Sequence, residues 1–326
     1  MADSEATPGQ VRFTVLGPLG ITDGSETAIL PPSKPSALLA SLLLHANTVV
    51  PVPYLQRAIW GEEPPETAKA AVQTCVLRLR RLLGKHGLPA CVIEAVSDGY
   101  RINADATTLD LLHFRGLLHR ARAADSPAAE LGPLRQALSL WHSRPILGNV
   151  NSALLQRDLI PRLTEEWLQA VERIFDIELA LGRYREVLAE IVSMARSHPA
   201  HERFWEQLIE ALHRTGRRAE ALAEYRRVKQ HLLDELGIDP GPALQRLELA
   251  ILRGDPPEPA PPALDRRAPS GSVVLESLLQ AGLLEEGPQG DYRMNELLQT
   301  FTRAAAGEHT VSGSSTALLL RRTTRT

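Results

Sequence analysis

The sequence is poor in the residues that build cross-linked, metal-bound or membrane-embedded proteins. Its 326 residues include only two cysteines, Cys75 and Cys91, and no Cys-x-x-Cys pair. This excludes a disulfide scaffold and a zinc ribbon, and it suits a reducing compartment. The polar, acidic N-terminus does not resemble a signal peptide, and no apolar run approaches the ~20 residues of a membrane helix. We therefore expect a cytoplasmic protein with no membrane partner.

Aromatic residues and excess charge are also scarce. Aromatics make up 4% of the chain, so its cores must rest on Leu, Ala and Val, which favours helices over strands. The net charge is only −3, so no overall positive field draws the chain to nucleic acid. Any nucleic-acid binding must come from a local patch, on one of the two or three domains that this length predicts.

Motifs of catalysis and cofactor binding are missing as well. The chain has no H-E-x-x-H, no G-x-S-x-G and no phosphate-binding G-x-x-x-x-G-K-[ST]. His198 and His201 are three residues apart, but they flank Pro199 at an expected helix start. Helix capping and surface exposure explain them better than a metal site does. We expect no enzyme activity, no cofactor and no metal.

The first hundred residues alternate between strand and helix patterns. After a disordered stretch at 1–10, we expect strands at 11–16 and 27–30, then a helix capped by Ser33 with Pro35 in its first turn. Two more helices, ended by Gly61 and Gly84, and a hairpin follow, at 52–60, 67–83 and 91–103. This order of elements is typical of a winged helix-turn-helix domain, predicted at 11–104.

The next 150 residues have a helical pattern throughout and contain an internal repeat. Gly182 and Gly216 lie 34 residues apart in similar surroundings, which is the tetratricopeptide period. Each repeat would be a pair of helices that buries its apolar face against the next pair. The expected fold class is therefore mostly α with a small β component: a winged helix followed by an all-α, tetratricopeptide-like domain at 105–255.

The C-terminal part is less regular. Prolines without an apolar period predict a linker at 256–271. A small helical, winged-helix-like remnant is expected at 272–306, with a helix to Ala281, a strand pair around Gly287–Gly290 and a helix from Asn295. We expect a disordered tail at 307–326. This segment resembles the small helical region that closes a nucleotide-binding ATPase domain in larger proteins. A remnant of such a region and an accident of composition stay open alternatives.

The helix at 67–83 has two different faces. Val72, Val76, Leu79 and Leu83 form an apolar stripe, and no acidic residue occurs from Thr67 through Val92. A helix fits the major groove, where Gln and Arg reach base edges and Arg pairs with phosphates. Taken alone, this helix also suits an ordinary solvated face. The candidate DNA-binding residues, which include Arg101 of the hairpin as a minor-groove contact, are Lys69, Gln73, Thr74, Leu77, Arg78, Arg80, Arg81 and Arg101.

Longer motifs turn this pattern into a family resemblance. Residues 11–103 resemble the winged helix of response-regulator effectors, through Ala58-Ile-Trp-Gly, Val76-x-Arg78-Leu-Arg-Arg and Gly99-Tyr-Arg-Ile. Residues 109–255 resemble the bacterial transcriptional activation domain, through His198-Pro-x-x-Glu-Arg, Gly216-Arg-x-Ala-Glu-Ala-Leu and Leu233-Asp-Glu-Leu-Gly-Ile-Asp-Pro-Gly-Pro. In this order the two resemble the antibiotic regulatory protein family of actinobacteria such as Streptomyces.

The resemblance implies a function. Such a protein would activate a secondary-metabolite gene cluster, bind promoter direct repeats as a homodimer on double-stranded DNA, and recruit RNA polymerase including its sigma factor. Leu77 departs from the family pattern, which has a small or polar residue there, and this puts the base preference in doubt. Two other readings stay open: a protein–protein scaffold, and a regulator gated by a small molecule in the helical domain.

Overall fold

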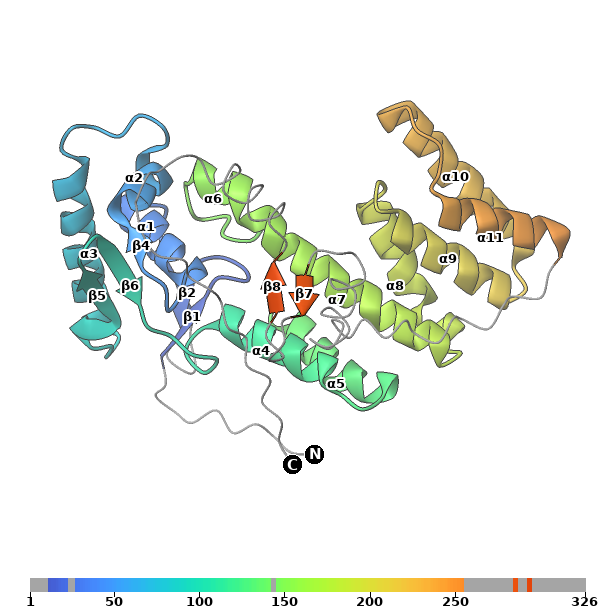
Figure 1. Cartoon of the computed structure of the whole chain (residues 1–326), viewed down its shortest axis with the longest axis horizontal. Helices are drawn as coiled ribbons and strands as arrows, with labels where there is room; N and C mark the ends of the chain where they lie inside the picture. The colour runs from blue at the N-terminus through green and yellow to red at the C-terminus, as the bar shows by residue number, and fades with distance from the viewer. Residues whose placement is uncertain (1–10, 23–26, 142–144, 255–283, 287–291, 295–326) are drawn as a thin grey trace. The chain divides into compact units, whose positions relative to one another are not determined.

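The computed structural model describes residues 11–22, 27–141, 145–254, 284–286 and 292–294 (Figure 1). The chain forms two compact units, residues 1–263 and 264–326. The described part of the first unit is mostly helical, with small sheets near the N-terminus, as expected. None of the helices in the described ranges is both long and apolar enough to cross a membrane.

The first sheet has one strand more than the sequence analysis expected. It consists of β1 (Arg12–Thr14), β2 (Gly20–Thr22) and β3 (Thr27–Ile29), antiparallel in the order β1-β2-β3. The two-strand prediction omitted β2, because three residues between turn signals are too few to display an alternating pattern. Phe13 and Ile21 pair across the sheet and are both buried, so β2 contributes directly to the core.

Three helices follow, and the structure confirms the predicted cap of the first and the predicted bounds of the second. Helix α1 (Lys34–Leu44) begins after Ser33, whose Oγ accepts the backbone N–H of Ser36 at 3.2 Å. Helix α2 (Val52–Trp60) ends at Gly61, which has φ 77°. Helix α3 (Ala68–Lys85) passes through Gly84, where the sequence analysis placed its end. The left-handed turn is made instead by Gly87, also at φ 77°.

The hairpin forms as expected and gains a third strand. A short 3₁₀ turn (Ala90–Val92) leads into β5 (Ile93–Val96), which pairs with β6 (Gly99–Ile102). The short strand β4 (Val50–Pro51) pairs with the other edge of β6. Gly99 is required there, because a Cβ at this position would lie 2.2 Å from the carbonyl oxygen of Val50. Tyr100 is half-buried and packs against the core.

The second half of the first unit is a series of packed helices. Gly182 (φ 77°) separates α7 from α8, and Gly216 (φ 79°) separates α9 from α10, so the repeated glycines occupy equivalent turns. The apolar side chains of α9, including Phe204, Trp205 and Leu208, are buried between these helix pairs. The helices are α4 (Asp110–Arg122), α5 (Pro127–Ser139), α6 (Ala153–Asp158), α7 (Ile160–Ala180), α8 (Tyr184–Ser197), α9 (Glu202–Arg214), α10 (Arg218–Leu236) and α11 (Pro242–Arg253).

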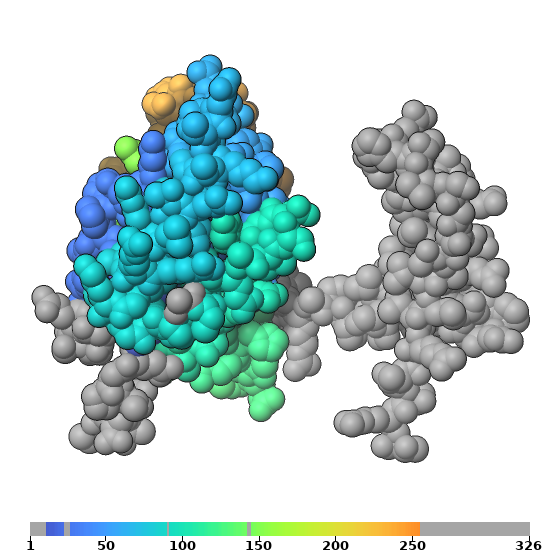
Figure 2. All heavy atoms as spheres, turned by 90° about the vertical axis from the view of Figure 1, so that its left-hand side faces the viewer, coloured from blue at the N-terminus to red at the C-terminus, as the bar shows by residue number. Residues whose placement is uncertain are grey.

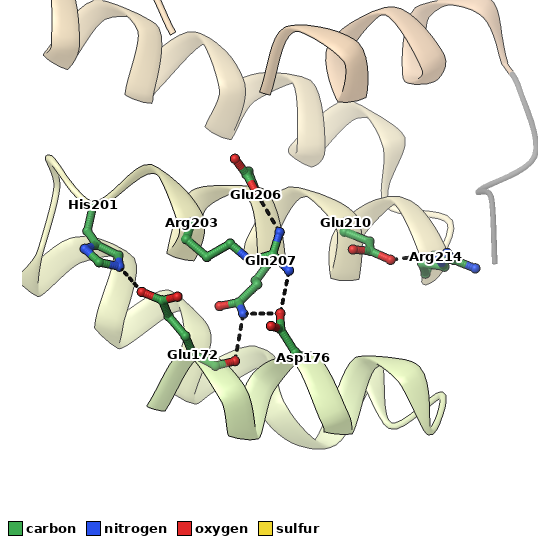
Figure 3. Close-up of polar contacts among 8 residues, drawn as sticks. All are labelled: Glu172, Asp176, His201, Arg203, Glu206, Gln207, Glu210 and Arg214. Atoms are coloured by element: carbon green, nitrogen blue, oxygen red, sulfur yellow. Dashed lines mark hydrogen bonds and ion pairs between the residues drawn. The ribbon is translucent and has the colours of Figure 1, made fainter. Parts of the chain in front are cut away.

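Polar side chains join the two repeats (Figure 3). On α9, Gln207 is fully buried, and its Nε2 donates to the carbonyl oxygen of Glu172 at 3.0 Å and to Oδ1 of Asp176 at 2.7 Å. Arg203 also pairs with Asp176, at 2.5 Å, and His201 pairs with Glu172. His201 thus joins the start of α9 to α7. The described residues include no group of three or more side chains that could hold a metal ion.

The winged-helix part and the helical part are joined by hydrogen bonds to backbone groups. The carboxylate of Asp110, 3% exposed, accepts the N–H groups of Val15 and Leu16 at 2.9 and 3.0 Å. Asn149 accepts the N–H of Leu19 and donates to the carbonyl oxygens of Leu19 and Leu30 at 2.9 and 2.7 Å. Such buried contacts fix the first sheet against the helices. The domain boundary at residues 104–105 stays a prediction.

The second unit contains the strand pair predicted around Gly287–Gly290. Strand β7 (Leu284–Glu286) pairs antiparallel with β8 (Tyr292–Met294). The predicted helices that end at Ala281 and begin at Asn295 lie outside the described residues, as do the linker at 256–271 and the terminal stretches 1–10 and 307–326.

The Asp110 contacts lead to a stability prediction. Asp110→Ala leaves two buried N–H groups without their acceptor, which costs about 1–3 kcal/mol each. At roughly 2–4 °C per kcal/mol for a domain of this size, the midpoint of thermal unfolding, followed by circular dichroism, should fall by about 4–24 °C. Asp110→Asn, which keeps one acceptor oxygen, should lose less. The exposed Asp125→Ala is the control, and equal midpoints for Asp110→Ala and Asp125→Ala would contradict the prediction.

Candidate nucleic-acid interface

Helix α3 presents a single solvent-exposed face opposite its buried stripe. Ala68, Val72, Cys75, Val76, Leu79 and Leu83 are buried, because α3 packs there on α1 and α2. The exposed residues recur every three to four positions, so they share one side of the helix. Of the predicted site, this face carries Lys69, Gln73, Thr74, Leu77, Arg78 and Arg81. In Figure 2 the side of the molecule that contains α3 and the hairpin faces the viewer.

The exposed face is cationic. Lys69, Arg78, Arg81 and Lys85 are all exposed, and none of them forms an ion pair with another residue in the part of the chain described. Lys85 belongs to this face because α3 runs beyond Gly84, the residue at which its pattern predicts an end. Four cations along one face of the helix, without acidic partners in the described part of the chain, attract a polyanion and are available to it.

Three side chains within this face differ in what they offer. Gln73 is exposed and carries both a donor and an acceptor. Thr74 is exposed too, but its hydroxyl donates to the carbonyl oxygen of Ala70 at 3.1 Å. Leu77 is 53% exposed, which is unusual for a leucine in a folded domain. The face therefore combines cations with the side-chain amide of Gln73 and the apolar side chain of Leu77.

Cys75 lies beneath this face and is not a reactive group. Burial raises the pKa of the Cys75 thiol, while the nearby charges of Arg78 and Lys34 lower it by less. A thiol with a raised pKa stays protonated and is a poor nucleophile. Cys75 contributes packing to α3 rather than chemistry.

Arg80 has a structural contact that its sequence pattern did not predict. Its Nε and Nη2 donate to the carbonyl oxygen of Ile93, at 3.2 and 2.6 Å, and the side chain is half-buried. This bond joins α3 to the first strand of the hairpin. Two of the five N–H donors of the guanidinium are used, so three stay available for a second partner.

Arg101 is paired across the hairpin. In the strand register it lies opposite Glu94, and its Nε and Nη2 donate to Oε2 of Glu94 at 3.1 and 2.6 Å. This hydrogen bond from Arg101 lowers the pKa of Glu94, so the carboxylate stays charged. Asn103 donates to the other carboxylate oxygen. Arg101 is 38% exposed, but it would have to leave Glu94 to contact an anion with its full charge.

The hairpin tip itself carries no cation. Val96, Ser97 and Asp98 are exposed, and the carbonyl oxygen of Asp98 accepts the N–H of Val52 at the start of α2. The structure thus brings six of the eight predicted residues together on the exposed face of α3, and places Arg80 and Arg101 at contacts within the protein. Glu94 and Ile93 were missed because their role depends on strand pairing.

The two hydrogen bonds from Arg80 to the carbonyl oxygen of Ile93 lead to a test that separates fold stability from DNA binding. Arg80→Ala should lower the thermal midpoint by a few degrees, because it removes about 1 kcal/mol of half-buried hydrogen bonding. Arg81→Ala, one residue away at an exposed position, should leave the midpoint unchanged. The two variants have the same charge and are compared by circular dichroism. Identical midpoints would show that the contact to Ile93 adds no stability.

Comparisons with known proteins agree with this architecture. Residues 26–102 match the family model described as "Transcriptional regulatory protein, C terminal", and residues 109–252 match the model described as "Bacterial transcriptional activator domain". The first match contains α1, α2, α3 and the hairpin, and the second contains α4 to α11 almost entirely.

Individual relatives come from actinobacteria. The chain is 34% identical over 279 residues to the regulatory protein DnrI of Streptomyces peucetius, which covers 81% of this chain and 100% of that protein. It is 38% identical over 256 residues to the regulatory protein AfsR of Streptomyces coelicolor. The matched region covers 77% of this chain but only 25% of AfsR.

A solved structure has the same fold. It is that of Mycobacterium tuberculosis EmbR in complex with a low affinity phosphopeptide, with a TM-score of 0.69 and 31% sequence identity, and it covers 88% of this chain and 78% of EmbR. The matched models describe transcriptional regulators, and the two Streptomyces relatives are named regulatory proteins. The chain therefore belongs to the Streptomyces antibiotic regulatory protein family, in which a response-regulator-type winged helix precedes a bacterial transcriptional activator domain, and it is a transcriptional regulator of that type.

Proposed function

We propose that this regulator is a sequence-specific, DNA-binding activator of a secondary-metabolite (antibiotic) gene cluster. The observation that carries the proposal is the exposed face of α3, where four cations lie beside Gln73 and Leu77 without an acidic partner among the described residues. Its similarity to DnrI over that protein's whole length supports the choice of target. We infer that it acts in the cytoplasm, where bacterial promoters are.

The residues of α3 divide into two roles. Lys69, Arg78 and Arg81 are proposed to contact phosphates, which supply most of the affinity without reading sequence. Gln73 and Thr74 are proposed to reach base edges in the major groove, and Leu77 is suited to a thymine methyl group.

Arg80 and Arg101 are the remaining members of the proposed DNA contact. Arg80 would use its free N–H donors while it keeps its bond to Ile93. Arg101 would enter the minor groove only if it broke its hydrogen bonds to Glu94. A narrow minor groove favours this exchange, because its electrostatic potential is more negative than that of a wide one. Its contribution is therefore expected to be smaller than that of Arg81.

Assembly on the promoter is the second part of the proposal. One small winged helix covers a short site, so we propose that two copies bind a direct repeat side by side, which raises the effective concentration of the second copy. The activator domain would then offer a surface to RNA polymerase, including its sigma factor. The firm attachment of the first sheet through Asp110 and Asn149 supports this arrangement, because it keeps α3 and the helical domain together.

Replacing two phosphate-contacting cations tests the role of α3. In gel-shift titrations with a promoter fragment, Arg78→Ala combined with Arg81→Ala should weaken binding by about 10- to 100-fold. The slope of log affinity against log salt should fall by about 2, one per lost phosphate contact. Both effects are expected with an unchanged thermal midpoint.

The control has the same change in charge at another place. Arg226 and Arg227 are exposed on α10, and Arg226→Ala combined with Arg227→Ala should leave DNA affinity unchanged. If the α3 variant binds as the wild type does, the assignment of α3 as the recognition helix is wrong.

Footprinting tests the proposed assembly. On promoters adjacent to the gene, the purified chain should protect a direct repeat whose units are about one helical turn apart, ~10–11 base pairs. A single protected unit would contradict the dimer but not the recognition helix. No sequence-specific protection anywhere would favour a protein–protein scaffold instead.

A further inference from the structure

A cavity of about 450 Å³ lies in the helical domain, among α5, α7 and α8. Figure 1 shows α5 and α8 on either side of part of α7, and α7 packs on both. The cavity is partly open to solvent, and its volume lies within the range of small-molecule sites.

The floor of the cavity is apolar and comes from α7. Val171, Ile174 and Phe175 line it and are 5%, 6% and 2% exposed, so their side chains form a fixed surface. Trp167 also lines the cavity, and its ring lies 6.2 Å from that of Trp141. A flat apolar ring system is the shape that such a floor and an aromatic wall would accept.

The rim is polar, and its cation is held in place. Arg135 lines the cavity from α5, with a side chain that is 60% exposed, and it pairs with Glu178. Glu178 is 1% exposed and also accepts Arg183 at 3.0 Å, so two guanidinium groups share one buried carboxylate. Arg135 is thus oriented, yet it keeps N–H donors that are not used by Glu178. Glu190 lines the rim as well, from α8, and is exposed to solvent.

We propose that this cavity binds a small aromatic anion, with its rings on the floor formed by α7 and its acidic group on Arg135. Glu190 would disfavour a second negative charge at the opposite rim, so the ligand carries one acidic group. The proposal goes beyond the regulation of transcription and does not depend on it, because it concerns binding to the helical domain alone.

Two dyes with one ring system provide the test. The probe 1-anilinonaphthalene-8-sulfonate has the proposed chemistry, and N-phenyl-1-naphthylamine is the same ring system without the sulfonate. Both are titrated into the full chain and followed by dye fluorescence. Arg135→Gln should weaken the sulfonate about tenfold, because a charge-assisted bond is lost, and leave the neutral dye unchanged. Glu190→Gln should strengthen the sulfonate a few-fold.

Blocking the cavity locates the binding. Ser193 is exposed and lines the rim, so Ser193→Trp should fill the space and abolish binding of both dyes. Ala223→Trp, at an exposed position on α10 away from the cavity, is the matched control and should bind both dyes as the wild type does. If Arg135→Gln does not fold, Arg135→Lys replaces it. This variant keeps the positive charge, so it is expected to bind the sulfonate.

The outcomes separate the parts of the proposal. Unchanged binding in Ser193→Trp would place the dyes elsewhere, for example on the exposed Leu249 and Leu252 of α11, and would overturn the cavity as the site. An equal effect of Arg135→Gln on both dyes, or no effect on either, would overturn the selectivity for an anion. Since neither readout uses DNA, failure here leaves the recognition helix untouched.

Discussion

One buried carboxylate, that of Asp110, joins the first sheet to the helical domain and so holds the two parts of the first unit together. Asp110 stands at the start of α4 and accepts the backbone N–H groups of Val15 and Leu16, where the chain leaves the first strand. A buried charge is tolerated only when hydrogen bonds compensate it, and buried N–H groups need an acceptor, so each group satisfies the other. Asn149 makes a similar set of contacts with Leu19 and Leu30. The first sheet is therefore bound to the helical domain, and α3 belongs to a body that includes that domain.

The arginines of the helical domain and the cations of α3 differ in whether they form ion pairs. In the helical domain, arginines pair with carboxylates on neighbouring helices, as Arg173 does with Glu130 and Arg203 with Asp176. Such pairs at partly exposed positions contribute mainly to the geometry between helices, because solvent screens them. On α3 no acidic residue occurs from Thr67 through Val92, and within the described part of the chain the exposed cations of this helix form no ion pair. A chain with a net charge of −3 can therefore hold a local basic face. The same pairing logic orients Arg135 at the rim of the cavity, where a buried glutamate fixes it.

Much of the fold followed from local patterns in the sequence. The Ser33 cap, the end of α2 at Gly61 and the repeated turns at Gly182 and Gly216 were predicted, because each depends on the conformation of a few adjacent residues. The errors were also local. Strand β2 is too short for a period, and Gly84 is tolerated within α3 because an exposed glycine weakens a helix without ending it. Most of the proposed contact face on α3 was found as well, since helical spacing alone decides which residues share a side.

By itself, the sequence determined the family, the order of the domains and the two faces of α3, because motif spacing and helical period are properties of the chain. Only the tertiary structure distinguished Arg80, Arg81 and Arg101. Arg81 stays in solvent, while Arg80 meets the carbonyl oxygen of Ile93 and Arg101 meets Glu94. The cavity among α5, α7 and α8 likewise gathers Arg135, Phe175 and Ser193 from distant segments. In both cases strand pairing or helix packing brings together residues that are distant in the sequence. A local sequence pattern cannot predict such contacts.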